Sequence, residues 1–402
     1  MKVALVSWES LAGPAWTETA EIVTGTARAL AARGAEMHVF TALGPQQPSE
    51  AVLDGVSYHR CAHDEDADPQ VELDSFGRAV AGRLAKEERR APFGVVHGFG
   101  WPASAVLSEL RSESGRPLVW SLSTDANDWN KPAWLLDSPE AEPAHRYHPD
   151  EFADRILVPS DQAGDVFMAR WAARCPIEIA HPGVDPDPLK EVVDAARVKA
   201  PYGIGTFDPV VLYTGHFTPR GRPWLILDAL FHLLGGQPNA KAIFVGSGEL
   251  GEHVRERALV LGIDEAVRFA GELPAPDLAR LFRACDVVCL PERSQRLVAP
   301  YLDGWAAAKP VVITRSHAAS VFVWHEVTGY VAEDTADGIA EGLMWMFEDF
   351  DRCRWVGRNG RSAVEDAFGW PAISAKLLDC YERAMSERGL TGQSKHVVRR
   401  ER

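Results

Sequence analysis

The sequence predicts an α/β protein made of two doubly wound domains, each a mostly parallel sheet with helices on both faces. Short runs rich in β-branched residues alternate with helical patterns along most of the 402 residues, and this order is typical of parallel sheets. The alternation starts again near residue 209, and a chain of this length accommodates two ordinary domains. In such sheets ligands bind beyond the carboxyl ends of the strands, so we expect the site in a cleft between the domains.

In the first half, five apolar runs predict strands at residues 2–8, 36–43, 93–99, 116–123 and 155–160. Residues 17–34 have helical spacing and end at Gly34, a typical C-terminal cap. Two acidic stretches with proline, 63–70 and 137–151, are expected to be solvated loops.

The second half repeats the pattern, with strands predicted at residues 209–215, 240–248, 267–271, 286–291 and 309–314. Helical segments separate these strands. Residues 181–205, which precede them, are expected to connect the two domains.

Composition excludes several classes of function. Asp and Glu total 57 against 42 Lys and Arg, a net charge of −15, which argues against broad binding to nucleic acid or to anionic membranes. No apolar run reaches the roughly 18 residues needed to cross a bilayer, and the N-terminus is expected to be a strand, not a signal peptide. Of six cysteines only Cys285 and Cys289 are close. We therefore expect reduced thiols, no metal site and a cytoplasmic location.

Segments along nearly the whole chain resemble the retaining nucleotide-sugar glycosyltransferases of family 4, which are related to glycogen-synthase-like enzymes. The matching segments follow the order of that family, at residues 7–11, 33–42, 93–104, 153–160, 181–188, 198–215, 242–250, 268–291, 303–312, 323–331 and 357–370.

The resemblance implies the GT-B fold, in which two Rossmann-like domains enclose the sugar donor. It implies an N-terminal, acceptor-side domain at residues 1–185 and a nucleotide-sugar domain at 186–370. A C-terminal helix at 371–390 would return to the first domain, and 391–402 would form a polar tail. A nucleotide-diphosphate sugar would be the donor of an active member, and we expect no other cofactor.

The loop that holds the donor diphosphate departs from the family. The usual pattern is G-R-x-x-x-x-K-G, and Gly215 fixes its register here. His216 stands at the arginine and Gly221 at the lysine. Histidine is largely neutral at pH 7, and glycine has no charge. Arg220 and Arg222 flank the gap, and two interpretations stay open: either arginine reaches the phosphates, or both are surface charges.

The second signature of the family, two glutamates eight residues apart beside the donor sugar and ribose, is also altered. Gln295 stands at the first glutamate and Asp303 at the second, and Leu297 and Val298 replace the intervening Phe-Gly. Val298 adds a β-branched side chain where the glycine lets the backbone approach the donor, and Pro300 removes an amide donor.

Further donor-site positions differ as well. The resemblance places there a Gly-Gly pair against the diphosphate, a sugar-facing histidine, an aspartate, and a second Gly-Gly pair. These positions hold Thr17 and Glu18, Leu122, Gly100, and His317 with Ala318, respectively. A carboxylate at residue 18 would repel a diphosphate.

Two other features have competing interpretations. Gly246 and Gly248 form a G-x-G after a strand, which is either a plain strand-to-helix turn or, as in the family, a loop near the nucleotide. Trp16 and Trp224 fall at cleft-side positions where the family is small or polar. They either pack on their own domains or fill the donor site and anchor a partner.

Two hypotheses of function follow. In the first, the protein is a glycosyltransferase-like pseudoenzyme that no longer transfers sugar and acts as a structural or regulatory partner, in a complex with an intact relative or as a homo-oligomer. In the second, it is an active retaining glycosyltransferase with an altered donor site, in which Arg220 or Arg222 contacts the phosphates and Asp303 the ribose. The first hypothesis also predicts a donor cleft that is narrow or apolar.

Overall fold

A computed structural model describes residues 1–9, 18–64, 68–113, 115–122, 148–293 and 300–389. The chain divides into two compact units. One comprises Met1–Gly183 together with Trp370–Arg402, and the other comprises Val184–Gly369.

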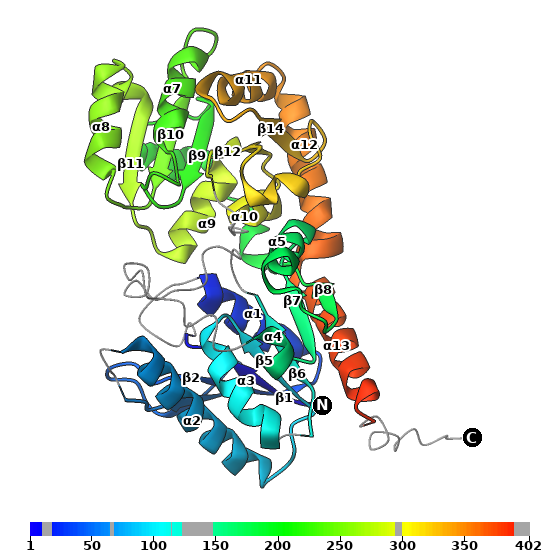
Figure 1. Cartoon of the computed structure of the whole chain (residues 1–402). Helices are drawn as coiled ribbons and strands as arrows, with labels where there is room; N and C mark the ends of the chain where they lie inside the picture. The colour runs from blue at the N-terminus through cyan, green and yellow to red at the C-terminus, as the bar shows by residue number, and fades with distance from the viewer. Residues whose placement is uncertain (10–17, 65–67, 114, 123–147, 294–299, 390–402) are drawn as a thin grey trace. The chain divides into compact units, whose positions relative to one another are not determined.

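An eight-stranded sheet forms the centre of the N-terminal unit (Figure 1). Its strands are β1 Lys2–Val6, β2 Glu36–Ala42, β3 Glu50–Leu53, β4 Val56–Cys61, β5 Val95–Phe99, β6 Leu118–Ser121, β7 Arg155–Val158 and β8 Ile177–Ile179. Their order across the sheet is β3-β4-β2-β1-β5-β6-β7-β8. Neighbouring strands are parallel, apart from the antiparallel pair β3 and β4.

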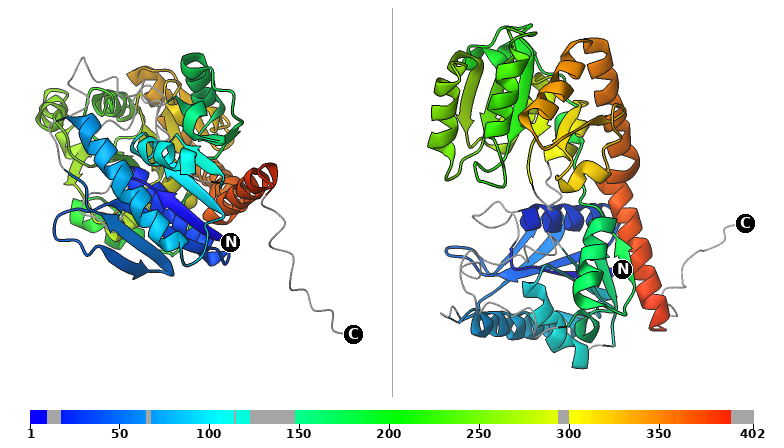
Figure 2. Two further views of the ribbon diagram at one scale, coloured as in Figure 1. Left: turned by 60° about the horizontal axis from the view of Figure 1, so that its bottom comes forward. Right: turned by 45° about the horizontal axis from the view of Figure 1, so that its top comes forward.

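Helices cover both faces of this sheet. They are α1 Glu18–Ala32, α2 Pro69–Glu88, α3 Pro102–Glu113, α4 Pro149–Phe152, α5 Asp161–Trp171 and α13 Trp370–Glu387. On one face α1 and α13 pack together over a core that includes Leu5 and Val39 (Figure 2). On the other face α2 and α3 cover a core that includes Phe76 and Trp120.

The C-terminal unit contains a six-stranded, wholly parallel sheet of order β11-β10-β9-β12-β13-β14. Its strands are β9 Val210–Thr214, β10 Lys241–Val245, β11 Val267–Gly271, β12 Val287–Leu290, β13 Val311–Thr314 and β14 Gly329–Ala332. One mostly parallel and one wholly parallel sheet, each with helices on both faces, confirm the predicted fold class.

The helices of this unit are α6 Ala195–Lys199, α7 Trp224–Leu233, α8 Gly251–Val260, α9 Ala275–Ala284, α10 Pro300–Ala306, α11 Ala336–Phe347 and α12 Phe350–Ala363. Short 3₁₀ turns lie at η3 Asp187–Leu189, η4 Ala200–Tyr202, η5 Asp264–Ala266 and η6 Ala318–Val321, and η7 Val364–Phe368 is a π-helical turn. Helices α7 and α11 pack against one face of the sheet, and α9 and α10 against the other.

Helices begin inside both expected loops and inside the expected connector, and α4 starts at Pro149 within the expected loop 137–151. Residues 181–205, expected to connect the two domains, contain η3, α6 and η4. Asp194 caps α6, because its carboxylate accepts hydrogen bonds from the backbone N–H groups of residues 196 and 197. Likewise α2 begins inside the expected loop 63–70, where the Asp68 carboxylate caps it. Residues 390–402 lie outside the described part of the chain.

The six cysteines are unpaired, and all except Cys175 are buried. Burial raises the pKa of the Cys285 thiol to about 12, so this group is an inert core thiol at neutral pH. No helix in the described ranges is both long and apolar enough to cross a membrane.

Candidate functional site

The candidate site lies at the carboxyl edge of the C-terminal sheet, where the loops after β9 and β10 are locked together. The Phe217 amide donates to the Ser247 carbonyl at 2.8 Å, and the Leu250 amide donates to the Phe217 carbonyl at 2.9 Å. Gly246 and Gly248 have φ values of +124° and +154°. A Cβ at Gly248 would lie 2.5 Å from the Phe217 oxygen, so this glycine is needed for the close approach of the two loops.

The position of the family's lysine has no room for a side chain. A Cβ built on Gly221 would lie 2.2 Å from the backbone oxygen of His216 and 2.9 Å from the hydroxyl oxygen of Tyr213. That hydroxyl itself donates to the His216 carbonyl at 2.9 Å, which holds the turn closed. The His216 side chain, at the position of the family's arginine, is exposed.

Arg222 is buried and has a left-handed backbone, with φ +47°. Its Nε donates to the Pro291 carbonyl at 2.7 Å. Its Nη2 lies within hydrogen-bond distance of Thr314 Oγ1 (3.0 Å), Ser316 Oγ (2.8 Å) and Asp334 Oδ1 (2.7 Å). The guanidinium therefore joins the loops after β12, β13 and β14. This differs from the expectation that Arg222 is either a surface charge or a phosphate ligand, because internal acceptors already hold it.

Asp334 completes this cluster as the counter-ion of Arg222. Burial alone would raise the pKa of its carboxyl group, but hydrogen bonds from Ser316 and Arg222 outweigh that effect and lower the pKa. The carboxylate is thus ionised at neutral pH, and it neutralises the buried guanidinium.

His317, where the family has glycine, is a buried and neutral side chain. Its Nδ1 accepts a hydrogen bond from the Ala319 amide at 3.0 Å and so caps η6. Its Nε2 lies 3.8 Å from Glu292 Oε2. Burial and the nearby Arg222 charge lower its pKa to about 3, so the imidazole supplies no positive charge to an anion at pH 7.

Other predicted positions of this unit are spread around the same edge. The Arg220 side chain is exposed, and its carbonyl accepts from the Arg293 amide at 2.9 Å. Trp224, the first residue of α7, is half-buried, and so is Asp303, in the first turn of α10. Gln295, Leu297 and Val298 lie outside the described residues.

In the N-terminal unit, two predicted positions follow neighbouring strands. Leu122 is buried after β6, and its amide donates to the Leu157 carbonyl at 2.8 Å. Gly100 follows β5 with φ +68°, and its carbonyl accepts from Trp120 Nε1 at 2.8 Å. Glu18 begins α1. Trp16 and Thr17 lie outside the described residues.

The sequence did not reveal a cluster formed by His38, His59 and Glu87, whose ligand atoms lie within 4.8 Å of one another. The two histidines are 21 residues apart on neighbouring strands, a separation that matches no metal motif. Arg83 is 3.1 Å from His59 Nδ1. A guanidinium only donates, so Nδ1 accepts and the proton of His59 is on Nε2.

That proton points to His38 Nδ1, 2.9 Å away, and His38 Nε2 in turn contacts the Glu36 carboxylate at 3.1 Å. The planes of the two rings are parallel within 3°, and their centroids are 5.2 Å apart, a separation that fits an end-to-end hydrogen bond. The arrangement is therefore a hydrogen-bonded chain. One proton joins His59 Nε2 to His38 Nδ1, and the Arg83 guanidinium lies beside the His59 ring.

Both halves of the chain match glycosyltransferase families. Residues 20–188 match the family described as "Glycosyltransferase Family 4", and residues 194–363 match "Glycosyl transferases group 1". The chain is 30% identical over 333 residues to a D-inositol 3-phosphate glycosyltransferase of Kribbella flavida, covering 78% of this chain and 76% of the relative. It is 29% identical to one from Mycobacteroides abscessus, covering 91% and 84% of the two chains.

Solved structures have the same fold. Sucrose-phosphate synthase from Thermosynechococcus elongatus superimposes with a TM-score of 0.76 at 20% identity, over 96% of this chain and 99% of that one. HepE from Anabaena, solved with UDP, gives 0.71 at 16% identity, over 95% and 100%. The chain belongs to the family-4-like glycosyltransferases with the GT-B fold, which confirms the resemblance predicted from the sequence.

Proposed function

We propose that this family member has lost sugar transfer and acts in the cytoplasm as a structural or regulatory partner. An intact relative is the partner that best fits this role. The observation that carries the proposal is the loop after β9. Its lysine position is Gly221, which the His216 carbonyl encloses, and the adjacent Arg222 is committed to internal acceptors. Neither position offers a cation to a diphosphate.

The loss of rate and of donor affinity expected without the two cations supports the same conclusion. Transfer from a nucleotide sugar develops negative charge on the departing diphosphate, and one preorganised electrostatic group contributes roughly 10²–10³ in rate. Each charge-assisted hydrogen bond to the ground state contributes about 1.5–3 kcal/mol of affinity. Loss of two cations therefore lowers both donor binding and turnover, even though such effects are not additive.

The second candidate function is an active retaining glycosyltransferase with an altered donor site. Relatives with 28–30% identity over most of the chain are named as glycosyltransferases, and the exposed Arg220 adjoins the same loop. In that case Arg220 would bind the phosphates and Asp303 the ribose.

Calorimetry with UDP, GDP and ADP, and with the corresponding sugar donors, separates the two candidates. We expect no binding tighter than millimolar, while a relative with a complete G-R-x-x-x-x-K-G loop binds its own donor. Micromolar binding that is lost in Arg220→Gln would establish the second candidate and refute the first.

The partner role needs its own measurement. Light scattering should give a heteromeric mass when the protein is mixed with an intact relative from the same genome, and the transfer rate of the relative should change. A monomer in both conditions, together with an unchanged rate, would contradict this role.

A further inference from the structure

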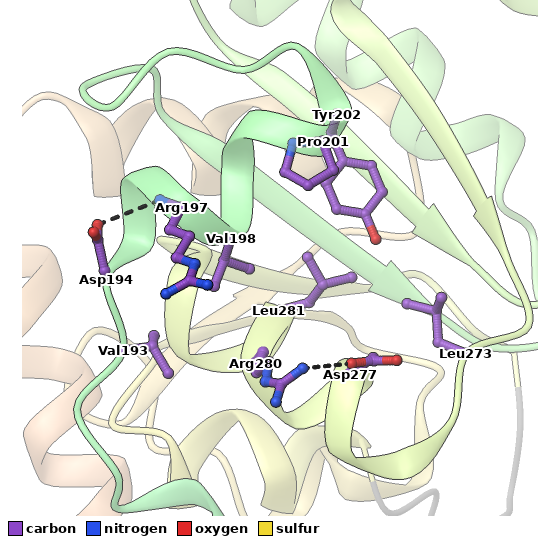
Figure 3. Close-up of a pocket in the computed structure, with 10 residues that line it drawn as sticks. All are labelled: Val193, Asp194, Arg197, Val198, Pro201, Tyr202, Leu273, Asp277, Arg280 and Leu281. Carbon is purple, nitrogen blue, oxygen red and sulfur yellow. Dashed lines mark hydrogen bonds and ion pairs between the residues drawn. The ribbon is translucent and has the colours of Figure 1, made fainter.

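A cavity of about 520 Å³ lies in the C-terminal unit between α6 with η4 and helix α9 (Figure 3). Its volume is within the range of sites for small ligands, roughly 300–1,000 Å³. The cavity uses none of the donor-site positions discussed above. Ligand binding in this cavity is therefore independent of sugar transfer.

The cavity has an apolar floor. Leu281 of α9 is 2% exposed, and Val198 of α6 and Leu273, just after β11, are half-buried beside it. In Figure 3 these three side chains point into the space between the two helices. Such a floor favours an apolar ring or a branched aliphatic group, because burial removes apolar surface from water.

The rim contains two carboxylates, and both are engaged. The Asp194 carboxylate caps α6 by accepting from the backbone amides of residues 196 and 197 at 3.0 and 3.3 Å. The Asp277 carboxylate pairs with Arg280 at 2.8 Å. These two negative charges make the rim unsuitable for a dianion, and they tolerate at most a singly charged head group.

Arg197 is the cation that remains. In the described part of the chain its guanidinium has no hydrogen-bond or ion-pair partner, and Figure 3 shows it pointing from α6 toward α9. The Tyr202 side chain, from η4, lies at the other end of the cavity, toward Leu273. A guanidinium above an apolar floor is suited to a planar carboxylate.

We propose that this cavity binds a small monocarboxylic acid with an apolar body. The carboxylate lies on the Arg197 guanidinium. The ring or branched chain covers Val198, Leu273 and Leu281. The exposed Arg280 strengthens the positive potential at the opening, although its pair with Asp277 reduces that contribution.

Benzoate is a suitable probe, because it combines a carboxylate with a planar apolar ring, and benzamide is its neutral counterpart. We expect the 402-residue chain to bind benzoate with a Kd of about 1 mM, a typical affinity for so small a ligand, in titrations followed by ligand-observed NMR. Benzamide should bind at least several-fold more weakly. Arg197→Gln should weaken benzoate binding about tenfold, the effect of one charge-assisted contact.

Two further variants make the test specific. Arg354→Gln removes an exposed arginine of α12, outside the cavity, and should leave the Kd unchanged. Val198→Trp should abolish binding by filling the floor, with the fold checked by circular dichroism. The proposal is overturned if benzoate shows no saturable binding up to tens of millimolar. It is also overturned if benzoate and benzamide bind equally, or if Arg197→Gln binds like the parent.

Discussion

At the scale of single residues, Arg222 shows how a departure from the family pattern is accommodated. The final glycine of G-R-x-x-x-x-K-G falls at this position, and the backbone there keeps a left-handed φ of +47°. A residue with a Cβ adopts that conformation at a cost of about 1–2 kcal/mol. Four internal acceptors for the guanidinium offset the cost.

Two substitutions separate these opposing effects. Arg222→Ala keeps the strained backbone and removes the hydrogen bonds of the guanidinium to Asp334 and its neighbours, so we expect it to lower the free energy of unfolding by about 1.5–3 kcal/mol. Arg222→Gly loses the same contacts but relieves the strain, and it should be about 1 kcal/mol more stable than the alanine variant. Urea denaturation followed by circular dichroism measures both. Equal stabilities of the two variants would show that the backbone is not strained.

Gly221 makes the family's loop difficult to restore. His216→Arg and Gly221→Lys together restore the two cations of the family pattern. However, a Cβ at residue 221 would lie 2.2 Å from the His216 carbonyl oxygen. We expect Gly221→Lys to destabilise the unit by about 1–3 kcal/mol, as overpacking does, and the double variant to gain no affinity for UDP in calorimetry. Gly115→Ala is the matched control, because its Cβ would meet nothing within 4 Å. A stable double variant that binds UDP would contradict this prediction.

At the scale of elements, α13 is fixed to the N-terminal unit by its first residue. The Trp370 ring lies against Gly25 of α1 and against Gly183, where a Cβ would come within 2.1 and 2.5 Å of ring atoms, respectively. The Arg33 side chain also donates to Ser374 and to the Pro371 carbonyl at 2.8 and 2.6 Å. Two glycines and one indole therefore set the distance between α1 and α13.

Gly25→Ala should reverse the usual effect of alanine in a helix. In an exposed helix alanine is more favourable than glycine by about 1 kcal/mol, and Gly82→Ala in α2 serves as that control because nothing lies within 4 Å. At Gly25 the indole cannot move away freely, so we expect a loss of about 1–3 kcal/mol. The smaller ring of Trp370→Phe should partly restore stability in the double variant, which a double-mutant cycle measures. Strict additivity would exclude the contact as the cause.

Sequence patterns predicted the central strands of both sheets because those strands are continuous apolar runs. The edge strands β3, β8 and β14 were missed, and so was β4, an inner strand whose sequence, VSYHRC, is not an apolar run. β8 and β14 have three and four residues, too few for a pattern, and β3 is mostly exposed. The sequence predicted which positions form the candidate site, but it did not predict the contacts of their side chains. The pattern could not show that Arg222 turns inward, because its acceptors come from residues 69 to 112 positions away.

At the scale of the whole molecule, several buried histidines are held neutral. His97 Nδ1 and Nε2 contact Tyr381 Oη at 2.6 Å and Ser121 Oγ at 2.7 Å, and burial lowers its pKa to about 3. Burial, with the charges of Arg83 and His38, lowers the pKa of His59 to about 4. With His317, three histidines thus have folded-state pKa values well below the unfolded value of about 6.5.

Stability should therefore fall with acidification well before the carboxylates are protonated. Between about pH 6.5 and pH 4 the unfolded chain binds protons at these histidines and the folded chain does not. Each site then removes about 1.4 kcal/mol of stability per pH unit. Their contribution to stability is complete above pH 6.5 and declines as the pH falls toward the folded-state pKa values.

Urea denaturation at pH 7, 6 and 5 should show this slope, and His97→Gln should reduce it by about one proton. An unchanged slope in His97→Gln would show that His97 does not cause the acid sensitivity.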